Sequence, residues 1–172
     1  MKTTLSIWSA SCRSCLSRVM EALYMPIVDY KFHPDGTLPT GNEVFVFGSN
    51  LGGYHGKGAA LVAKEKFGAQ YKQGIGYMRD PKTGAACYAI PTKDQRILTL
   101  PLDVIRQHID NFINFASEHP ELQFFMTRVG CVLAGYSDAD IAPLFQGATS
   151  NIIFPGQWAE YIQPECRRTL KG

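Results

Sequence analysis

The sequence predicts an α/β protein built as a three-layer α/β/α sandwich, with a mixed, largely parallel central sheet. Two observations support this fold class. Short segments rich in β-branched and aromatic residues alternate along the chain with segments of helical periodicity, which is the pattern of a parallel sheet with helices on both faces. The chain also has 172 residues, of which 45% are hydrophobic and 19% are charged. That composition suits one domain with a substantial core and is too apolar for a disordered chain.

The first predicted unit is a strand, a glycine-rich loop and a helix. It follows a stretch rich in Pro and Gly, residues 33–42, where no long regular element can form. Residues 43–47 are mostly β-branched or aromatic, which favours a buried strand. Residues 48–58 form the glycine-rich loop, and residues 59–67 are dense in strong helix formers until Gly68 ends the helix.

The middle of the chain predicts a loop or hairpin, a short strand and a long helix. Residues 73–86 contain several turn residues and precede a short strand at residues 87–90. Pro101 then opens a helix that ends at His119 and Pro120. Its apolar residues recur at helical spacing and predict its buried face: Leu102, Ile105, Ile109, Phe112, Ile113 and Ala116.

A second unit of strand, loop and helix follows. Residues 122–129 predict a strand that runs into a second glycine-containing loop, residues 130–136. Ser137 with Asp140 three residues later has the form of a capping box, which starts a helix that reaches Phe145. A last strand is predicted at residues 151–154.

Composition argues against several classes of function. Lys and Arg total 17 against 15 for Asp and Glu, a net charge of +2, so we expect no direct sequence-specific binding of nucleic acid. No run of eighteen apolar residues occurs, so we expect no membrane partner. The five cysteines are irregularly spaced, which fits reduced thiols in the cytoplasm. We expect no cofactor, and no metal site because the four histidines lack ligand spacing: His33, His55, His108 and His119.

Residues 25–172 are expected to form a single domain, with residues 1–24 as an N-terminal appendage that is disordered or helical. Met25 could be a natural start of the chain. Cys12 and Cys15 form a Cys-x-x-Cys pair. No second pair of ligands supports zinc binding there, and no βαβ context supports a redox site, so we interpret this segment as a poorly structured leader.

Both glycine-containing loops leave predicted strands at the edge of the sheet where ligands bind in open α/β proteins. Each loop also ends at a predicted helix N-terminus, where unpaired backbone N–H groups and the helix dipole favour an anion. If neighbouring strands carry the two loops, they would close around a diphosphate from both sides. The alternative is that the glycines only supply tight turns between strand and helix. The first loop has neither P-loop nor dinucleotide-binding spacing, which disfavours an NTPase or a dehydrogenase.

Five segments in a fixed order carry a resemblance to a known family. They are the Gly-Ser-Asn at the end of the first strand and residues 55–60, 64–68, 90–93 and 128–133. Together these segments resemble a macro domain, and they are most similar to the branch that includes the terminal ADP-ribose protein glycohydrolase and ADP-ribose-1″-phosphate phosphatases. The match covers residues 35–154. The resemblance implies ADP-ribose, or an ADP-ribosylated macromolecule, as the partner.

The resemblance also implies roles for single residues. Asp35 would accept a hydrogen bond from the adenine amino group, or it could simply belong to an Asp-Gly turn. Asn50 would face the distal ribose, or it could be an Asx-turn residue. Tyr136 would flank a ribose, or it could pack in the core. The two sides of the diphosphate would be bound by loop residues, namely Gly56, Lys57 and Gly58 on one side and Gly130, Cys131, Val132, Ala134 and Gly135 on the other.

Catalysis is the more open part of the prediction. Lys93 stands where the glycohydrolase resemblance implies a lysine that attacks the anomeric carbon of the distal ribose, although a solvated lysine paired with Asp94 is the alternative. Ala134 stands where that branch has a catalytic aspartate. His55 is a second acid/base candidate beside the first loop, or it packs against a loop carbonyl.

Three hypotheses follow from these patterns. The first, which we favour, is a hydrolase acting on an ADP-ribosyl linkage or a related ADP-ribose derivative, with either Lys93 or a bound water assisted by the ligand's own phosphate as the agent. The second is a module that binds ADP-ribose or a nucleotide without turning it over. The third is a structural or interaction protein in which the glycines serve only as turns.

Overall fold

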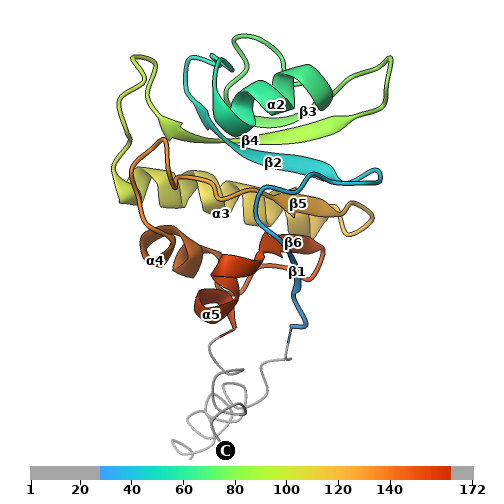
Figure 1. Ribbon diagram of the computed structural model, residues 1–172, viewed down its shortest axis with the longest axis vertical. Coiled ribbons are helices and arrows are strands. Elements are labelled where there is room, and N and C mark those ends of the chain that lie inside the picture. The colour runs from blue at the N-terminus through green and yellow to red at the C-terminus, as the bar shows by residue number, and fades with distance from the viewer. Residues whose placement is uncertain (1–27, 164–172) are drawn as a thin grey trace, which may run out of the picture.

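The structure is a computed structural model that describes residues 28–163 (Figure 1). Strands and helices alternate through most of this range. The strands are β1 (Lys31–His33), β2 (Val44–Asn50), β3 (Gly76–Arg79), β4 (Ala86–Lys93), β5 (Phe124–Met126) and β6 (Ile152–Pro155). The helices are α2 (Gly58–Lys66), α3 (Leu102–Glu118), α4 (Asp138–Ile141) and α5 (Ala159–Ile162), with 3₁₀ turns at Ala142–Phe145 and Gly156–Trp158.

The strands form one six-stranded sheet in the order β1-β6-β5-β2-β4-β3. All neighbouring pairs are parallel except β3 and β4, which are antiparallel. β2 therefore lies in the interior of the sheet, between β4 and β5. The carboxyl ends of these three strands meet at one edge, which is where a ligand site is expected in an open α/β sheet.

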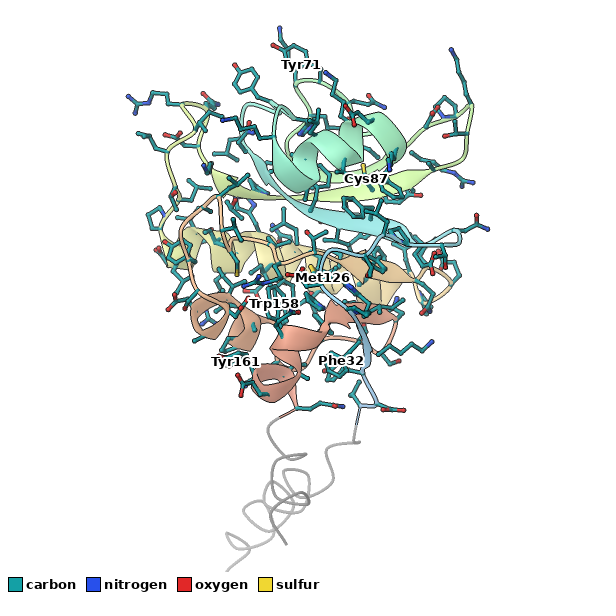
Figure 2. The ribbon with its side chains drawn as sticks, viewed as in Figure 1. Phe32, Tyr71, Cys87, Met126, Trp158 and Tyr161 are labelled. Carbon is teal, nitrogen blue, oxygen red and sulfur yellow. The ribbon has the colours of Figure 1, made fainter. Side chains whose placement is uncertain are left out.

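Alternate residues of the central strands face two separate cores. Along β2, Val44 and Val46 pack with α3 on one face, while Phe45 and Phe47 pack with α2 on the other. The larger core also includes the C-terminal elements, with Trp158 and Met126 inside it, whereas Cys87 lies between the sheet and α2 (Figure 2). Helices on both faces of a mixed, mostly parallel sheet confirm the predicted α/β sandwich.

Several boundaries differ from the prediction. The first strand continues through Asn50, because parallel pairing with β4 extends to Lys93 across a bulge after Ser49. The strand predicted at residues 122–129 is shorter, since only three residues form β5. The sequence did not indicate β1 or α5, which are only three and four residues long, too short for a periodic pattern to stand out.

The capping box predicted at Ser137 is present. The Ser137 hydroxyl and backbone N–H both bond to the Asp140 carboxylate, and the helix continues as a 3₁₀ turn to Phe145. The predicted appendage at residues 1–24, with Cys12 and Cys15, lies outside the described residues, as does Cys166. Among residues 28–163, no helix has the length and apolar character needed to cross a lipid bilayer.

Candidate ligand-binding site

A pocket of about 830 Å³ opens at the carboxyl ends of β2, β4 and β5. Two loops flank it, which we call the first loop (residues 51–57, after β2) and the second loop (residues 130–136, after β5). β2 and β5 are adjacent parallel strands, so the expectation that neighbouring strands carry the two loops is confirmed. Leu133 of the second loop also approaches the start of α2, because a Cβ atom at Gly58 would lie 2.9 Å from Cδ1 of Leu133.

Asn50 holds the first loop in shape from the end of β2. Its side-chain nitrogen donates to the carbonyl of Tyr54 at 2.7 Å, and its side-chain oxygen accepts from the Tyr54 N–H at 2.9 Å. Asn50 is buried and also lines the pocket. The Asn50 side chain therefore closes the loop in the manner of an Asx turn and also stands at the pocket wall.

A second segment, residues 69–75, braces the first loop from behind. The Ser49 hydroxyl donates to the Gly74 carbonyl, and the Lys72 N–H donates to the Gly53 carbonyl at 3.1 Å. The backbones approach so closely that a Cβ atom at Gly74 would lie 1.9 Å from the carbonyl oxygen of Asn50. We call residues 69–75 the bracing segment.

His55 belongs to this bracing and not to the pocket wall. The side chain is 3% exposed, and its edge packs against the ring of Phe47. Its Nε2 lies 3.0 Å from the Gln70 carbonyl oxygen and 3.1 Å from that of Gln73. Both partners are acceptors, so Nε2 carries the proton. The structure thus places this candidate acid/base among loop carbonyls, as in the alternative reading, and it is absent from the pocket lining.

The end of the first loop presents unpaired backbone donors to the pocket. Among the described residues, none accepts a hydrogen bond from the N–H groups of Gly56, Lys57 or Gly58. All three residues line the pocket, and Gly58 is the first residue of α2. The free donors and the positive end of the helix dipole together favour an anion at this point.

The second loop faces the first with unpaired donors of its own and an exposed apolar tip. The N–H groups of Gly130, Val132 and Ala134 also have no acceptor among the described residues. Val132 has φ +64°, an uncommon conformation for a β-branched residue, and its side chain is 76% exposed. Leu133 is 56% exposed. A strained backbone together with an exposed apolar side chain at the edge of a pocket is typical of a loop shaped for ligand contact.

A charged network fixes the base of the second loop. Arg128 donates to Asp138 from Nε at 3.0 Å and from Nη2 at 2.6 Å, and to Asp35 from Nη1 at 3.2 Å. Asp138 also accepts from Trp158 at 2.6 Å and from the Cys131 thiol at 3.3 Å. The Arg128 hydrogen bonds hold the pKa of Asp138 below its usual value. Burial raises the pKa of the Cys131 thiol to about 12, so Cys131 is a protonated, unreactive thiol at neutral pH.

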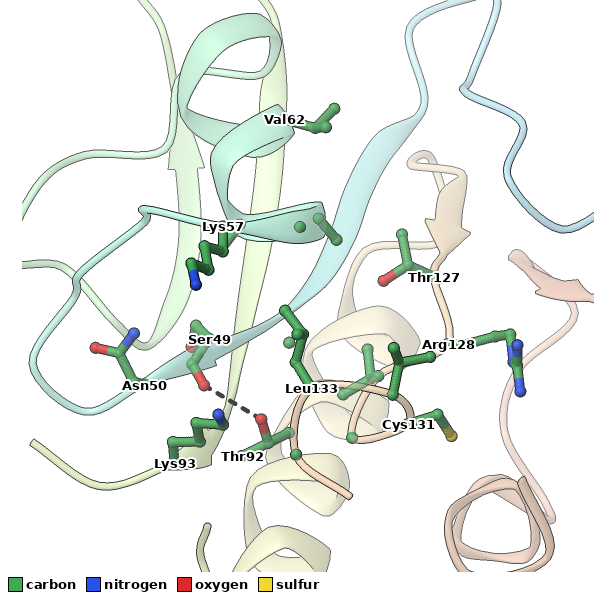
Figure 3. Close-up of a pocket in the computed structure, with 18 of the residues that line it drawn as sticks. Ser49, Asn50, Lys57, Val62, Thr92, Lys93, Thr127, Arg128, Cys131 and Leu133 are labelled. Atoms are coloured by element: carbon green, nitrogen blue, oxygen red, sulfur yellow. Dashed lines mark hydrogen bonds between the residues drawn. The ribbon is translucent and has the colours of Figure 1, made fainter. Parts of the chain in front are cut away.

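Asp35 is both a turn residue and a pocket residue. Its Oδ1 accepts from the N–H of Gly36 at 3.0 Å, and its Oδ2 pairs with Arg128. It lines the pocket at the end defined by Arg128, whereas Asn50 and Lys93 stand at the opposite end (Figure 3). The Asp-Gly turn and the pocket assignment are therefore compatible.

Lys93 lines the pocket beside Asn50, its register partner on β2. The alternative that Lys93 pairs with Asp94 is wrong, because Asp94 instead accepts from the N–H groups of Arg96 and Leu98 and pairs with the Arg96 side chain. Lys93 makes no ion pair within residues 28–163. Its ammonium group is available to a ligand.

Two predicted ligand residues do not reach the pocket. Tyr136 packs against the larger core and donates from its hydroxyl to the Leu100 carbonyl at 2.9 Å, so the packing interpretation is correct. Gly135 is also absent from the lining. Ala134 does line the pocket, and its carbonyl accepts from Thr99.

Within the described residues, no group of three or more His, Cys, Asp or Glu side chains could hold a metal ion.

Sequence reasoning missed several residues that line the pocket. Arg128 was recognised only as part of a motif, although its network organises one end of the pocket. His33 lines the same end, stacked on Phe125 with ring centroids 3.8 Å apart, and bonds to the Met126 carbonyl at 2.7 Å. The only sequence signal for Arg128 was its place between a strand and a glycine loop. His33 lies on the strand that the sequence did not indicate.

Solved structures share this architecture. The macrodomain of Mycobacterium tuberculosis DarG aligns with a TM-score of 0.58 at 16% identity, covering 74% of this chain and 97% of that one. The fold is that of a macrodomain. A protein of unknown function from Bacteroides thetaiotaomicron aligns with a TM-score of 0.52 at 16% identity, covering 75% of this chain and 98% of its own. The sequence itself matches no protein-family model and no curated protein.

Proposed function

We propose that this macrodomain binds ADP-ribose in the pocket between the two loops. One observation carries the proposal. Unpaired backbone donors of the first loop and of the second loop converge on a single pocket of about 830 Å³ from adjacent strands. Backbone donors at a helix N-terminus are suited to phosphate groups, and the volume lies in the range of small-molecule and cofactor sites.

The two ends of the pocket suggest the orientation of the ligand. The Asp35 carboxylate can accept from an amino group of a base, and the pocket lining also includes apolar side chains, among them Leu38 and Phe45. At the other end, Asn50 and Lys93 offer donors suited to a ribose. Adenine would then lie toward Arg128, the diphosphate between the loops, and the distal ribose toward Lys93.

We further propose hydrolysis of a bond at the anomeric carbon of the distal ribose, with Lys93 as the reacting group. In that reaction Lys93 first loses a proton to water, and its amine then forms a bond to the anomeric carbon as the bond to the linked group breaks and that group departs with the electron pair. Water next displaces the lysine nitrogen from the anomeric carbon, which releases ADP-ribose and returns the amine with its proton. The unpaired Lys93 beside Asn50 supports this proposal. Ala134 favours a second candidate function, binding without turnover, because Asp35 is the only carboxylate among the described residues that line the pocket and it lies at the far end.

Titration calorimetry with ADP-ribose tests the binding proposal. We expect saturable binding of one ligand per chain, and absence of binding at millimolar ADP-ribose would contradict the site. The catalytic part is tested by release of ADP-ribose from a mono-ADP-ribosylated protein. Lys93→Ala should reduce release about 100-fold or more while keeping the fold.

Lys64→Ala is the matched control, because Lys64 is exposed on α2 and does not line the pocket. It should release ADP-ribose at the wild-type rate. Equal release by wild type and Lys93→Ala would remove Lys93 from the mechanism. Binding without release by either protein would leave a reader of ADP-ribose.

A further inference from the structure

Lys57 is an unfavourable residue at the N-cap position of α2. It is the N-cap residue of α2, with φ −148° and ψ 157°, and it makes no side-chain capping bond. N-cap positions favour Ser, Thr, Asp and Asn, because their side chains accept from the free N–H groups of the first turn. A lysine offers only donors, and its positive charge is unfavourable beside the positive end of the helix dipole.

The rest of α2 does not compensate for Lys57. No acidic residue stands in its first turn, and both basic residues named at its end, Lys64 and Lys66, are at the favourable C-terminus. Helix α4 in the same chain shows the opposite design, with Ser137 at the N-cap, Asp138 in the first turn and a complete capping box. A residue that contradicts the N-cap and helix-dipole preferences, with no stabilising contact in return, indicates a functional constraint.

The Lys57 side chain lies at the end of the pocket that carries Lys93. Figure 3 shows Lys57 extending toward Ser49 and Asn50, with Lys93 on the other side of Ser49. The Lys57 side chain makes no ion pair or hydrogen bond within residues 28–163. The one carboxylate in the pocket lining, that of Asp35, is at the other end and already paired with Arg128.

The pocket is therefore electrically polarised. One end has two ammonium groups with no counter-ion, from Lys57 and Lys93. At the other end, the charge of Arg128 is outweighed by the carboxylates of Asp35 and Asp138. A ligand with its negative charge concentrated toward the lysine end fits this distribution, whereas a ligand whose charge lies near Arg128 does not.

We propose that Lys57 is a specificity-determining residue that binds the second phosphate of a diphosphate, the one nearer the distal ribose. This inference rests on the proposed binding of ADP-ribose and adds a side-chain cation to the backbone donors. It makes the pocket selective for nucleoside diphosphates and their esters over monophosphates. Lys57 would then lower the stability of α2 and raise the affinity for the ligand.

The Lys57→Ser variant tests both effects with two readouts of opposite sign. Serine is a favoured N-cap, so the melting temperature of the unliganded protein should rise by about 2–4 °C. Affinity for ADP-ribose and for ADP should fall about tenfold, as for loss of one charged hydrogen bond. Affinity for AMP should not change, because AMP lacks the second phosphate. Lys57→Arg should keep the affinity, and Lys64→Ser, which removes an equal charge outside the pocket, should leave all three affinities unchanged.

Inorganic pyrophosphate separates this inference from the proposed function. Wild-type affinity of Lys57→Ser for ADP-ribose and ADP would overturn the inference and leave ADP-ribose binding intact. An equal loss for AMP would also overturn it, because the effect would then not depend on the second phosphate. Pyrophosphate binding that requires Lys57, in a protein that does not bind ADP-ribose, would uphold the anion site and overturn the proposed function. Failure of the wild-type protein to bind pyrophosphate, ADP and ADP-ribose would overturn both.

Discussion

The two loops around the pocket are built in different ways. The first loop is held at several points, by the Asn50 side chain from the end of β2, by the His55 side chain within the loop, and by Ser49 and the bracing segment behind it. Among the described residues, the second loop has one internal hydrogen bond at its tip, from the Leu133 N–H to the Cys131 carbonyl, and the bonds that tie it to the rest of the protein lie near its ends. Arg128 and Asp138 fix its base, and the carbonyl of Ala134 accepts from Thr99 near its end, while its tip at Val132 and Leu133 is exposed.

This difference suggests a division of labour between the loops. Backbone that is hydrogen-bonded to several neighbours is costly to deform, so the braced residues of the first loop hold the unpaired N–H groups at its exposed end in one arrangement. An exposed tip with few partners moves at low cost, so the second loop can adjust around a bound ligand. Changes in the first loop should therefore alter stability, and changes at the tip of the second loop should alter affinity.

The largest effect is expected for Gly74→Ala in the bracing segment. The added Cβ atom would lie 1.9 Å from the Asn50 carbonyl oxygen, so the backbones of the two segments must separate. The free energy of unfolding should fall by about 3 kcal/mol or more, as measured by urea denaturation. Gly56→Ala is the control, since its Cβ would meet no atom within 4 Å, and it should change stability by less than about 0.5 kcal/mol.

An intermediate effect is expected for Asp138→Asn at the base of the second loop. Asn keeps one acceptor oxygen but loses the charge that pairs with Arg128 and part of the bonding to Trp158. The free energy of unfolding should fall by about 2 kcal/mol near pH 7. Retention of wild-type stability by Asp138→Asn would mean that the network does not hold the second loop.

The same variant predicts a pH dependence. The pKa of Asp138 is lowered in the folded protein, chiefly by its hydrogen bonds from Arg128. Its stabilising effect is thus complete above the unfolded pKa of about 4 and is lost as the pH falls through the lower folded value. The stability difference between wild type and Asp138→Asn should be constant from pH 7 to 5 and shrink toward pH 3. A difference that grows on acidification would contradict this assignment.

The smallest effect on stability is expected for Leu133→Ser at the tip of the second loop. Leu133 is largely exposed, so the free energy of unfolding should change by less than about 0.5 kcal/mol. Affinity for ADP-ribose should fall about threefold to tenfold, because the apolar contact that reaches Gly58 is lost. Strong destabilisation of Leu133→Ser, comparable to that of Gly74→Ala, would remove the contrast between the loops.

The sequence predicted the features that depend on local patterns. A run of β-branched and aromatic residues located β2, the helical spacing of apolar residues located α3, and Ser137 with Asp140 located α4. The two glycine loops gave the position of the pocket, because strand order in a parallel sheet brings their ends together. The alternation of strand-like and helical segments along the chain also predicted the fold class, without any knowledge of which strands are neighbours.

The features that were missed depend on contacts between distant segments. The pairing of Arg128 with Asp35 joins residues 93 positions apart, and no local spacing encodes it. His55 beside a phosphate loop suggested catalysis, but only the position of residues 69–75 shows that its Nε2 faces carbonyl oxygens. Tyr136 was ambiguous for the same reason, since its hydroxyl partner at Leu100 lies in another loop.

Amide hydrogen exchange, with and without saturating ADP-ribose, tests the central claim most directly. The claim is that backbone donors of both loops bind one diphosphate. The account predicts slower exchange on ligand binding at residues 56–58 and at residues 130–134, with the bracing segment already protected in the free protein. Unchanged exchange in both loops, or protection of one loop alone, would contradict it.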